Sequence, residues 1–372
     1  MLTSLAEQPR QGTVLGGKYR LTRSLGTGSM GSVWAAINET TSREVAVKLI
    51  LGSSPDLRRR LLREARLCGA LRHPNIIDMY DVAETADGEP FLVMELLSGE
   101  TLAQLLKQKR RLESSQAARI ALDAARALEA AHALGIIHRD LKPANIFLHS
   151  PPGTADSIVK VLDFGVAKNL VDDDGLRTVI GGLVGSPAYM SPEQARADRT
   201  IDHRSDLWSL GVVLFQMLTG TRPFAGEPHE VLQKLDTGAI ATVSELVRDA
   251  DPRLSAVVAR CLKRDRDERF SSAAEVVRLL EEVVKADRSA AAPSIGFTAR
   301  RCWKERSERL WTGGDGDPRY SLSTFTGARS GARAGSLLAR WRARSRLREG
   351  WLGMGMRGDG PRLPGGASAA NR

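Results

Sequence analysis

Short runs of apolar residues dominate the first hundred positions, and their lengths predict strands. Turn-rich segments separate these runs, which lie at residues 19–21, 33–37, 45–50 and 91–96. One stretch, residues 57–71, has helical spacing instead, because apolar side chains recur at Leu57, Leu61, Ala65 and Cys68. Residues 1–17 are polar and lack periodicity, so we expect a loose segment there. The pattern predicts a small lobe of strands with one helix.

Beyond Leu97 the apolar positions repeat mainly at helical spacing. A helix is predicted over residues 114–134, with one apolar face formed by Ile120, Ala124, Leu128, Ala131 and Leu134. Ser114 or Ser115 can cap its start, and Gly135 can end it in a left-handed turn. Residues 207–218 are apolar nearly all round, which predicts a deeply buried helix, and residues 272–284 form a last amphipathic pattern. We therefore expect an α+β fold with a second, larger and mainly helical lobe.

The positive charge of the chain is concentrated after residue 287. The net charge is +10 over 372 residues, but residues 288–372 hold 17 of the 54 Lys and Arg and 6 of the 44 Asp and Glu. The remaining 37 basic and 38 acidic residues leave the rest of the chain at −1, without a field that would attract nucleic acid. The tail is rich in Arg, Gly, Ala and Ser and holds four of the six Trp. We expect it to be mostly disordered.

Other bulk properties exclude several classes of protein. The three cysteines, at 68, 261 and 302, form no CxxC and no paired spacing, which predicts reduced thiols rather than disulfides or a zinc site. The first residues lack the apolar core of a secretory signal. The longest apolar run, 207–218, is too short to span a bilayer. We expect a soluble, cytoplasmic protein, and the sequence leaves its oligomeric state open.

A glycine-rich segment provides the first candidate chemistry. Residues 26–33 read Gly-Thr-Gly-Ser-Met-Gly-Ser-Val, which contains the pattern GxGxxGxV. Rossmann dinucleotide sites also carry GxGxxG, but there the glycines open a helix. Here they lead into the strand pattern of residues 33–37. A glycine-rich hairpin of this kind can lay its backbone N–H groups over phosphates.

Three further motifs follow in order. Lys48 ends the apolar run Val-Ala-Val-Lys and needs an anionic partner, for which Glu64 on the predicted helix is the candidate. Residues 138–145 read His-Arg-Asp-Leu-Lys-Pro-Ala-Asn, and Asp163-Phe164-Gly165 follows the short strand predicted at 158–162. Taken together, the order and spacing of these motifs are far more specific than any one of them.

With these motifs the chain resembles the eukaryote-like Ser/Thr protein kinases of bacterial type, from about Tyr19 to Val284. Residues 145–148 and 185–194 look most like the bacterial members. The resemblance implies a two-lobed protein kinase fold, with an antiparallel sheet and one helix in the N-lobe (18–97) and a helical C-lobe (98–287). Residues 1–17 and 288–372 would flank this domain as a flexible N-terminus and a basic tail.

The resemblance also implies the catalytic roles. Asp140 would orient the attacking hydroxyl and accept its proton, and Lys142 would neutralise the γ-phosphate of ATP. Lys48 would hold the α/β-phosphates and pair with Glu64. Asn145 and Asp163 would be the ligands of Mg²⁺ or Mn²⁺, since hard oxygen donors suit that ion. A lysine two places after the catalytic Asp is the Ser/Thr pattern, so protein Ser and Thr hydroxyls would be the substrates.

Further positions would bind the nucleotide or hold the site in place. The nucleotide-binding set implied by the resemblance is Leu25, Gly26, Gly28, Gly31, Val33, Ala46, Lys48, Met94, Glu95, Leu97, Phe147 and Asp163. Within it, Met94 would be the gatekeeper and the backbone of Glu95–Leu97 would meet adenine. Asp206 would hold the catalytic loop by its backbone. Glu193 and Arg269 would form an ion pair that anchors the activation segment.

Several alternatives stay open. A pseudokinase would bind nucleotide without catalysis, although Lys48, Asp140 and Asp163 are all present. Cys68 fits a buried core thiol better than a redox switch. The tail could be a solvated segment, an arm that binds RNA or membrane, or a read-through of a GC-rich gene. Thr178, the only hydroxyl between Phe164 and Gly185, could carry a phosphate that meets Arg139, whereas the acidic run 172–174 could satisfy Arg139 without one.

Overall fold

The computed structural model describes residues 10–28, 31–50, 65, 69–151, 153–154, 157–164, 187–198 and 200–291. The helix predicted at 57–71 falls mostly outside these ranges, and so do the tail after residue 291 and the segment 165–186. Within the described part, no helix has both the length and the apolar character needed to cross a membrane.

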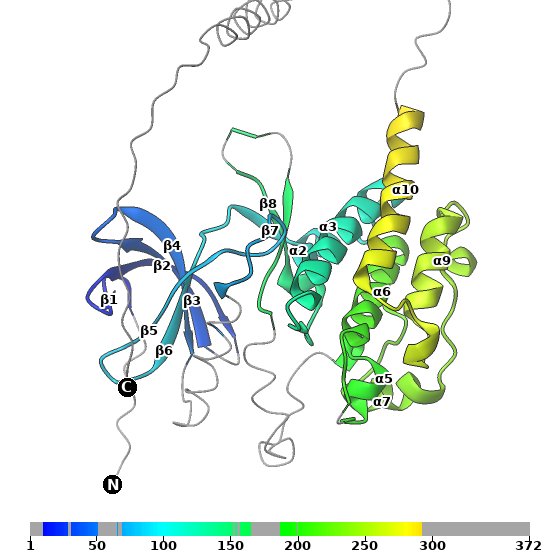
Figure 1. Ribbon diagram of the computed structural model, residues 1–372, viewed down its shortest axis with the longest axis horizontal. Helices are drawn as coiled ribbons and strands as arrows, with labels where there is room; N and C mark the ends of the chain where they lie inside the picture. The colour runs from blue at the N-terminus through cyan, green and yellow to red at the C-terminus, as the bar shows by residue number, and fades with distance from the viewer. Residues whose placement is uncertain are drawn as a thin grey trace, which may run out of the picture. The chain divides into compact units, whose positions relative to one another are not determined.

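The N-lobe is built on one antiparallel sheet of six strands (Figure 1). The strand order is β1-β2-β3-β4-β6-β5, with β1 (Val14–Leu15), β2 (Tyr19–Gly28), β3 (Gly31–Asn38), β4 (Arg43–Ile50), β5 (Met79–Glu84) and β6 (Pro90–Met94). β2 and β3 pair from Tyr19↔Asn38 to Gly28↔Gly31, so the glycine motif forms the hairpin that the sequence predicts. The glycine at 31 is required, because a Cβ there would lie 1.8 Å from the Leu49 carbonyl oxygen.

The N-lobe begins earlier than the sequence predicts. Val14 and Leu15 pair with Arg20 and Tyr19, and Leu15 is buried in the sheet core. The expectation of a loose segment through residue 17 is therefore wrong for this strand. A two-residue strand carries too little pattern to be recognised. The strand predicted at 91–96 ends at Met94, two residues short of the prediction.

The C-lobe is mainly helical, as predicted. Its helices are α2 (Leu102–Lys109), α3 (Ser114–His132), α5 (Pro192–Ala195), α6 (Arg204–Thr219), α7 (Pro228–Thr237), α8 (Val243–Leu246), α9 (Pro252–Cys261) and α10 (Ala273–Ala291). Short 3-10 turns lie at η1 (Pro143–Asn145), η3 (Pro187–Tyr189) and η4 (Arg266–Glu268). A small antiparallel sheet joins β7 (Gly99–Thr101), β8 (Ile146–His149) and β9 (Ile158–Val161). The predicted catalytic motifs lie next to these strands, since residues 138–145 precede β8 and Asp163 follows β9.

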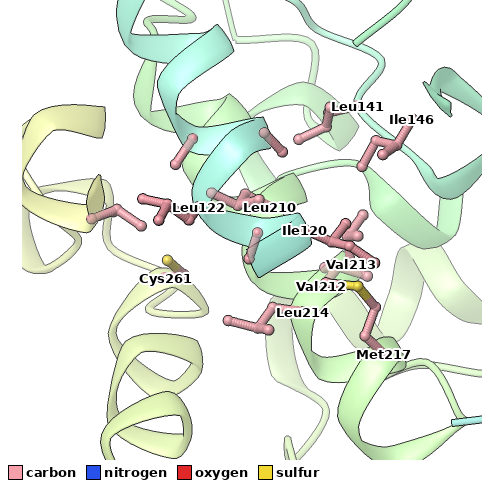
Figure 2. Packing of buried hydrophobic residues seen from close by; sticks show 14 of the residues in the cluster. Ile120, Leu122, Leu141, Ile146, Leu210, Val212, Val213, Leu214, Met217 and Cys261 are labelled. Atoms are coloured by element: carbon pink, nitrogen blue, oxygen red, sulfur yellow. The ribbon is translucent and has the colours of Figure 1, made fainter. Parts of the chain in front are cut away.

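One large apolar core holds the C-lobe together. It is centred on α3 and α6, and α6 is buried on nearly every side, as its sequence predicts. Figure 2 shows Leu141 and Ile146 in the same core as the side chains of these two helices. These two residues flank η1, and both are fully buried. The loop between them is therefore fixed at both ends by apolar packing, which is worth about 1.5–3 kcal/mol for each such side chain.

Both ends of α3 test the sequence prediction. The helix starts after Glu113, which makes no side-chain capping bond, so the predicted capping role of Ser114 or Ser115 is wrong. Gly135 follows the helix with a φ of 73°, as predicted for a left-handed turn. Leu134, predicted on the apolar face, lies beyond the helix end and is 59% exposed. At the other end of the lobe α10 continues to Ala291, so the predicted domain boundary at Asp287 falls inside a helix.

Candidate active site

The predicted lysine of β4 lies beside the first residue of the Asp163-Phe164 motif. Lys48 Nζ is 2.6 Å from Asp163 Oδ1, and the Lys48 side chain is mostly buried while that of Asp163 is 45% exposed. β4 presents the ammonium group from the N-lobe sheet, and β9 leads to the carboxylate from the C-lobe. The ion pair brings a cation and a hard oxygen donor from the two lobes together at one point.

The catalytic motif forms a hydrogen-bonded cluster of its own. Lys142 Nζ donates to Asp140 Oδ2 over 2.8 Å. Asn145 Nδ2 donates to the Asp140 carbonyl at 2.9 Å and to its Oδ2 at 3.4 Å. The backbone N–H of Leu162 donates to the Asn145 carbonyl at 2.8 Å, which links this cluster to the strand before Asp163. Four of the predicted residues, together with Lys48, are thus parts of one connected site.

Asp206 holds the loop that carries Asp140, as the family resemblance implies. This fully buried carboxylate begins α6 and accepts the backbone N–H groups of His138 and Arg139, each at 2.8 Å. His132 at the end of α3 adds a third contact, with Nε2 2.8 Å from Asp206 Oδ2. Burial alone would raise the pKa of Asp206, but the hydrogen bonds from His132 and from the backbone keep it below its ordinary value. The carboxylate is therefore ionised and holds the loop.

Two positions of the site adopt a backbone conformation that L-residues rarely take. Arg139 has a φ of 60° and Asp163 a φ of 53°. Such a residue costs of order 1–3 kcal/mol and persists only where its surroundings impose it. The backbone of Arg139 is held on both sides. Its N–H donates to Asp206, and its carbonyl accepts a hydrogen bond from Gln194 Nε2 at 2.9 Å. The fold gives up stability for the geometry of these two residues.

His138 is a structural residue. Its Nδ1 accepts the backbone N–H of Asp140 at 3.2 Å, so the proton is assigned to Nε2, which lies 2.9 Å from the Leu162 carbonyl. The ring also packs on Phe164, with centroids 4.7 Å apart. Because both ring nitrogens bind backbone groups, His138 cannot act as a base.

Replacing Asp206 by Asn tests how strongly the loop depends on this carboxylate. An amide has one oxygen acceptor, whereas His138 and Arg139 donate to two different oxygens. One buried N–H then faces an NH₂ group, so Asp206→Asn should lower the free energy of unfolding by about 1–3 kcal/mol. Urea denaturation measures the change. Asp236→Asn on exposed α7 is the control, expected within about 0.5 kcal/mol of wild type. Equal stability of Asp206→Asn and wild type would contradict the role.

The strand register assembles the residues predicted to surround a purine ring. Val33 pairs with Lys48 across β3 and β4, and Ala46 pairs with Met94 across β4 and β6. Phe147 lies on β8, opposite Lys160 of β9. Leu25, Gly26 and Gly28 lie on β2, and Leu25 is exposed at the lobe surface.

The segment after β6 leaves two backbone groups for an incoming molecule. The Glu95 N–H donates to the Asp78 carbonyl at 2.9 Å. Within the described ranges, neither the Glu95 carbonyl nor the Leu97 N–H makes a hydrogen bond. An acceptor and a donor two residues apart match the edge of a base such as adenine.

The residues expected to hold a divalent cation fit that ion. Mg²⁺ is commonly bound by one or two carboxylates together with phosphate oxygens and water. Asp163 supplies a half-exposed carboxylate. Asn145 uses its amide nitrogen on Asp140, which leaves its amide oxygen as a ligand. The described residues contain no group of three or more His, Cys, Asp or Glu side chains that could hold a metal.

A buried ion pair joins the segment before α6 to the last part of the lobe. Arg269 Nη1 and Nη2 bind the two carboxylate oxygens of Glu193 at 2.7 and 2.8 Å. Both side chains are almost completely buried, and Ser205 donates to the same carboxylate at 2.6 Å. This contact confirms the pair that the family resemblance implies.

Comparison with known families identifies the fold. The protein kinase domain family matches residues 19–281. The chain belongs to this family. The kinase family also confirms the predicted two-lobed fold.

Individual kinases are similar to this chain in sequence and in structure. Serine/threonine-protein kinase PknB of Mycolicibacterium smegmatis is 39% identical over 269 residues, which cover 70% of this chain and 42% of the relative. Serine/threonine-protein kinase PksC of Streptomyces coelicolor is 38% identical over 291 residues, covering 75% and 51%. A double mutant of the Mycobacterium tuberculosis PknI kinase domain superposes with a TM-score of 0.59 at 26% identity, over 74% of this chain and 98% of that domain. The chain spans about half or less of the curated relatives.

Some predicted residues lie outside the described part of this kinase. Glu64, the predicted partner of Lys48, is one of them, as are Cys68, Gly165 and Thr178. The predictions for these positions stay predictions.

Sequence reasoning missed contacts that support the kinase site. Lys160 is a buried lysine on β9, and its Nζ is 2.6 Å from Glu95 Oε1 in the hinge. The rule applied to Lys48, that a lysine in an apolar strand needs an anion, would have found it. His132 and Gln194 carried no comparable signal, because their partners are 74 and 55 residues away.

Proposed function

We propose that the chain is a Ser/Thr protein kinase that transfers the γ-phosphoryl group of ATP to protein hydroxyls, including its own. The observation that carries this proposal is the connected cluster of Asp140, Lys142 and Asn145, linked through Leu162 to the Lys48–Asp163 pair. Phosphoryl transfer needs in-line positioning and cations near the γ-phosphate rather than covalent help from the protein. The cluster supplies a carboxylate base and two ammonium groups within one site.

Each residue has a distinct part in this reaction. Asp140 orients the substrate hydroxyl and accepts its proton as the new O–P bond forms. Lys142, already 2.8 Å from Asp140, neutralises charge on the γ-phosphate while its bond to the leaving ADP oxygen breaks. Lys48 binds the α- and β-phosphates, and its ion pair with Asp163 keeps it in the cleft. Bound Mg²⁺ would be held by Asp163 and Asn145, and it would neutralise charge on the phosphates of ATP.

The hydroxyl specificity follows from Lys142 and from the relatives. A lysine two places after Asp140 is the pattern of Ser/Thr kinases, and PknB and PksC are both named serine/threonine-protein kinases. The adenine ring of ATP would bind the Glu95 carbonyl and the Leu97 N–H. We place the kinase domain between β1 and the end of α10. Thr178 is the proposed autophosphorylation site, because it is the only hydroxyl between Phe164 and Gly185.

Labelled ATP tests the proposal directly. Purified full-length protein is incubated with labelled ATP and Mg²⁺, beside an Asp140→Asn variant, and the phosphorylated residues are mapped by mass spectrometry. Asn keeps an oxygen for Lys142 but cannot accept a proton, so incorporation should fall by about 10²-fold or more. Phosphate should be found on Ser and Thr, with Thr178 among them. If the variant is labelled as fast as wild type, the proposed function is wrong.

A further inference from the structure

An exposed basic surface lies beside the active site and takes no part in the chemistry above. We call it the basic edge and define it as Lys107, Lys109, Arg110, Arg111 and Arg222, all exposed. The first four lie at the end of α2 and in the turn after it. Arg222 follows the end of α6. Gly220, two residues earlier, lies so close to the turn that a Cβ on it would be 3.1 Å from the Arg110 carbonyl oxygen. Two separate segments therefore place five cations together.

The basic edge is held in a strained backbone. Arg110 has a φ of 61° and a ψ of −57°, and the Arg111 N–H donates to the Lys109 carbonyl at 2.7 Å, which is a γ-turn of the rare, strained type. The Leu112 N–H donates to the Met217 carbonyl at 2.7 Å and fixes the turn on α6. Glycine would adopt this conformation without strain. An arginine there exposes one more cation at an energetic cost, which points to a use for the charge.

The charge of the basic edge is largely uncompensated. Within the described ranges, Lys107, Lys109, Arg110 and Arg222 make no ion pair. Arg111 is 4.0 Å from Asp249, whose side chain is 79% exposed. Glu113, the acid nearest to the turn in the sequence, makes no ion pair with a residue of the described part. A fixed surface with this excess of cations suits an anionic segment of a partner.

The location of the basic edge sets which part of a substrate it can reach. α2 packs against η1, which contains Asn145 of the catalytic loop. A helix of eight residues is about 12 Å long, so the basic edge lies no more than roughly that far from the part of α2 that contacts η1. An extended peptide advances about 3.3–3.6 Å per residue. Spanning about 12 Å takes at least three to four extended residues, so side chains four or more positions from the phosphorylated hydroxyl can reach the basic edge.

From this geometry we propose that the basic edge binds the acidic run Asp172-Asp173-Asp174 of a second copy of the chain, when that copy presents Thr178 as substrate. The three carboxylates lie four to six residues before Thr178, which matches the reach of the basic edge. The inference rests on the proposed kinase function. It makes the basic edge a determinant of substrate choice, and it makes phosphorylation between two copies the preferred route.

Two peptides and two variants test this. One peptide has the sequence of residues 170–184, and the other carries Asn at 172, 173 and 174; a Thr178→Ala full-length kinase is the enzyme background for all assays. The test variant is Lys107→Gln, Lys109→Gln and Arg222→Gln, which spares the Arg110 turn and the Arg111 contact. The control is Lys263→Gln, Arg278→Gln and Lys285→Gln, which removes the same charge from exposed positions on the far part of the C-lobe.

We expect wild type and control to prefer the acidic peptide about tenfold in kcat/KM, as three exposed charge contacts allow. The test variant should lose this preference and treat the neutral peptide as wild type does. Salt should also remove the preference, because the Debye length falls from about 10 Å at 0.1 M to about 3 Å at 1 M.

Equal rates of wild type on both peptides would overturn the inference while leaving the proposed function intact. An equal loss on both peptides in the test variant would also overturn it. Failure on every peptide, together with no autophosphorylation of the unmodified chain, would instead refute the proposed function.

Discussion

Asp163→Ala should reduce phosphate transfer by at least about 10⁴-fold, the largest effect we expect on activity. The substitution removes the carboxylate proposed to bind Mg²⁺, and metal stabilisation of phosphoryl transfer is worth several kcal/mol. It also frees Lys48, whose Nζ is 2.6 Å from the Asp163 carboxylate. Single-turnover transfer from ATP to a protein substrate, measured at several Mg²⁺ concentrations, gives the rate. The remaining activity should not be restored by raising Mg²⁺.

A matched control separates catalysis from the loss of a surface ion pair. Asp236 on α7 is 48% exposed and pairs with Arg196 at 2.6 Å, much as Asp163 is 45% exposed and pairs with Lys48 at 2.6 Å. Asp236→Ala should keep activity within about twofold and stability within about 1 kcal/mol. If Asp163→Ala kept activity as Asp236→Ala does, Asp163 would not be a metal ligand, and the catalytic role proposed for its carboxylate would be wrong.

The parts of the fold that sequence could predict are those with a long regular pattern. α6 is apolar nearly all round and is buried on nearly every side, and the hairpin of β2 and β3 follows from glycines between strand patterns. Short elements could not be predicted, because Val14–Leu15 and Gly99–Thr101 form strands only through their partners. The exposed Leu134 shows the same limit, since the helical spacing continued past the point where the helix ends.

The contacts of the site could be predicted from sequence where they are local and not where they join distant residues. Asp140, Lys142 and Asn145 are close in the chain, so the sequence alone indicates their chemistry, and their contacts with one another are local. The contact of Asp206 with the loop spans 67 and 68 residues and came only from the family resemblance. His132 completes the same carboxylate from a third element. The packing of the folded chain decides which distant polar residue binds a buried carboxylate. A single sequence carries no local signal of that choice.

Arg269→Met should destabilise the kinase by about 3–5 kcal/mol at neutral pH, the largest effect we expect on stability. Removing one partner of a buried ion pair leaves the other charge without compensation. Arg269 binds both oxygens of Glu193 and also donates to the carbonyls of Lys263, Arg204 and Arg264. Methionine keeps most of the side-chain volume beside Trp208, so the loss reports charge and hydrogen bonding. Urea denaturation followed by fluorescence gives the free energy of unfolding.

The pH dependence of this variant identifies the buried carboxylate as the cause. In wild type, burial alone would raise the pKa of Glu193, but the hydrogen bonds and charge of Arg269, with Ser205, hold it below its ordinary value. A lowered carboxyl pKa stabilises the fold above the unfolded pKa of about 4.3, and this stability is lost as pH falls through the lower folded value. In Arg269→Met burial acts without that compensation and the pKa of Glu193 rises, so the variant is least destabilised in acid. The deficit relative to wild type should therefore shrink as pH falls from about 7 to 4.

The double variant Glu193→Leu with Arg269→Met has no buried charge and should be more stable than Arg269→Met at neutral pH. A deficit of Arg269→Met that is independent of pH would assign the loss to the three carbonyl contacts of Arg269 rather than to Glu193.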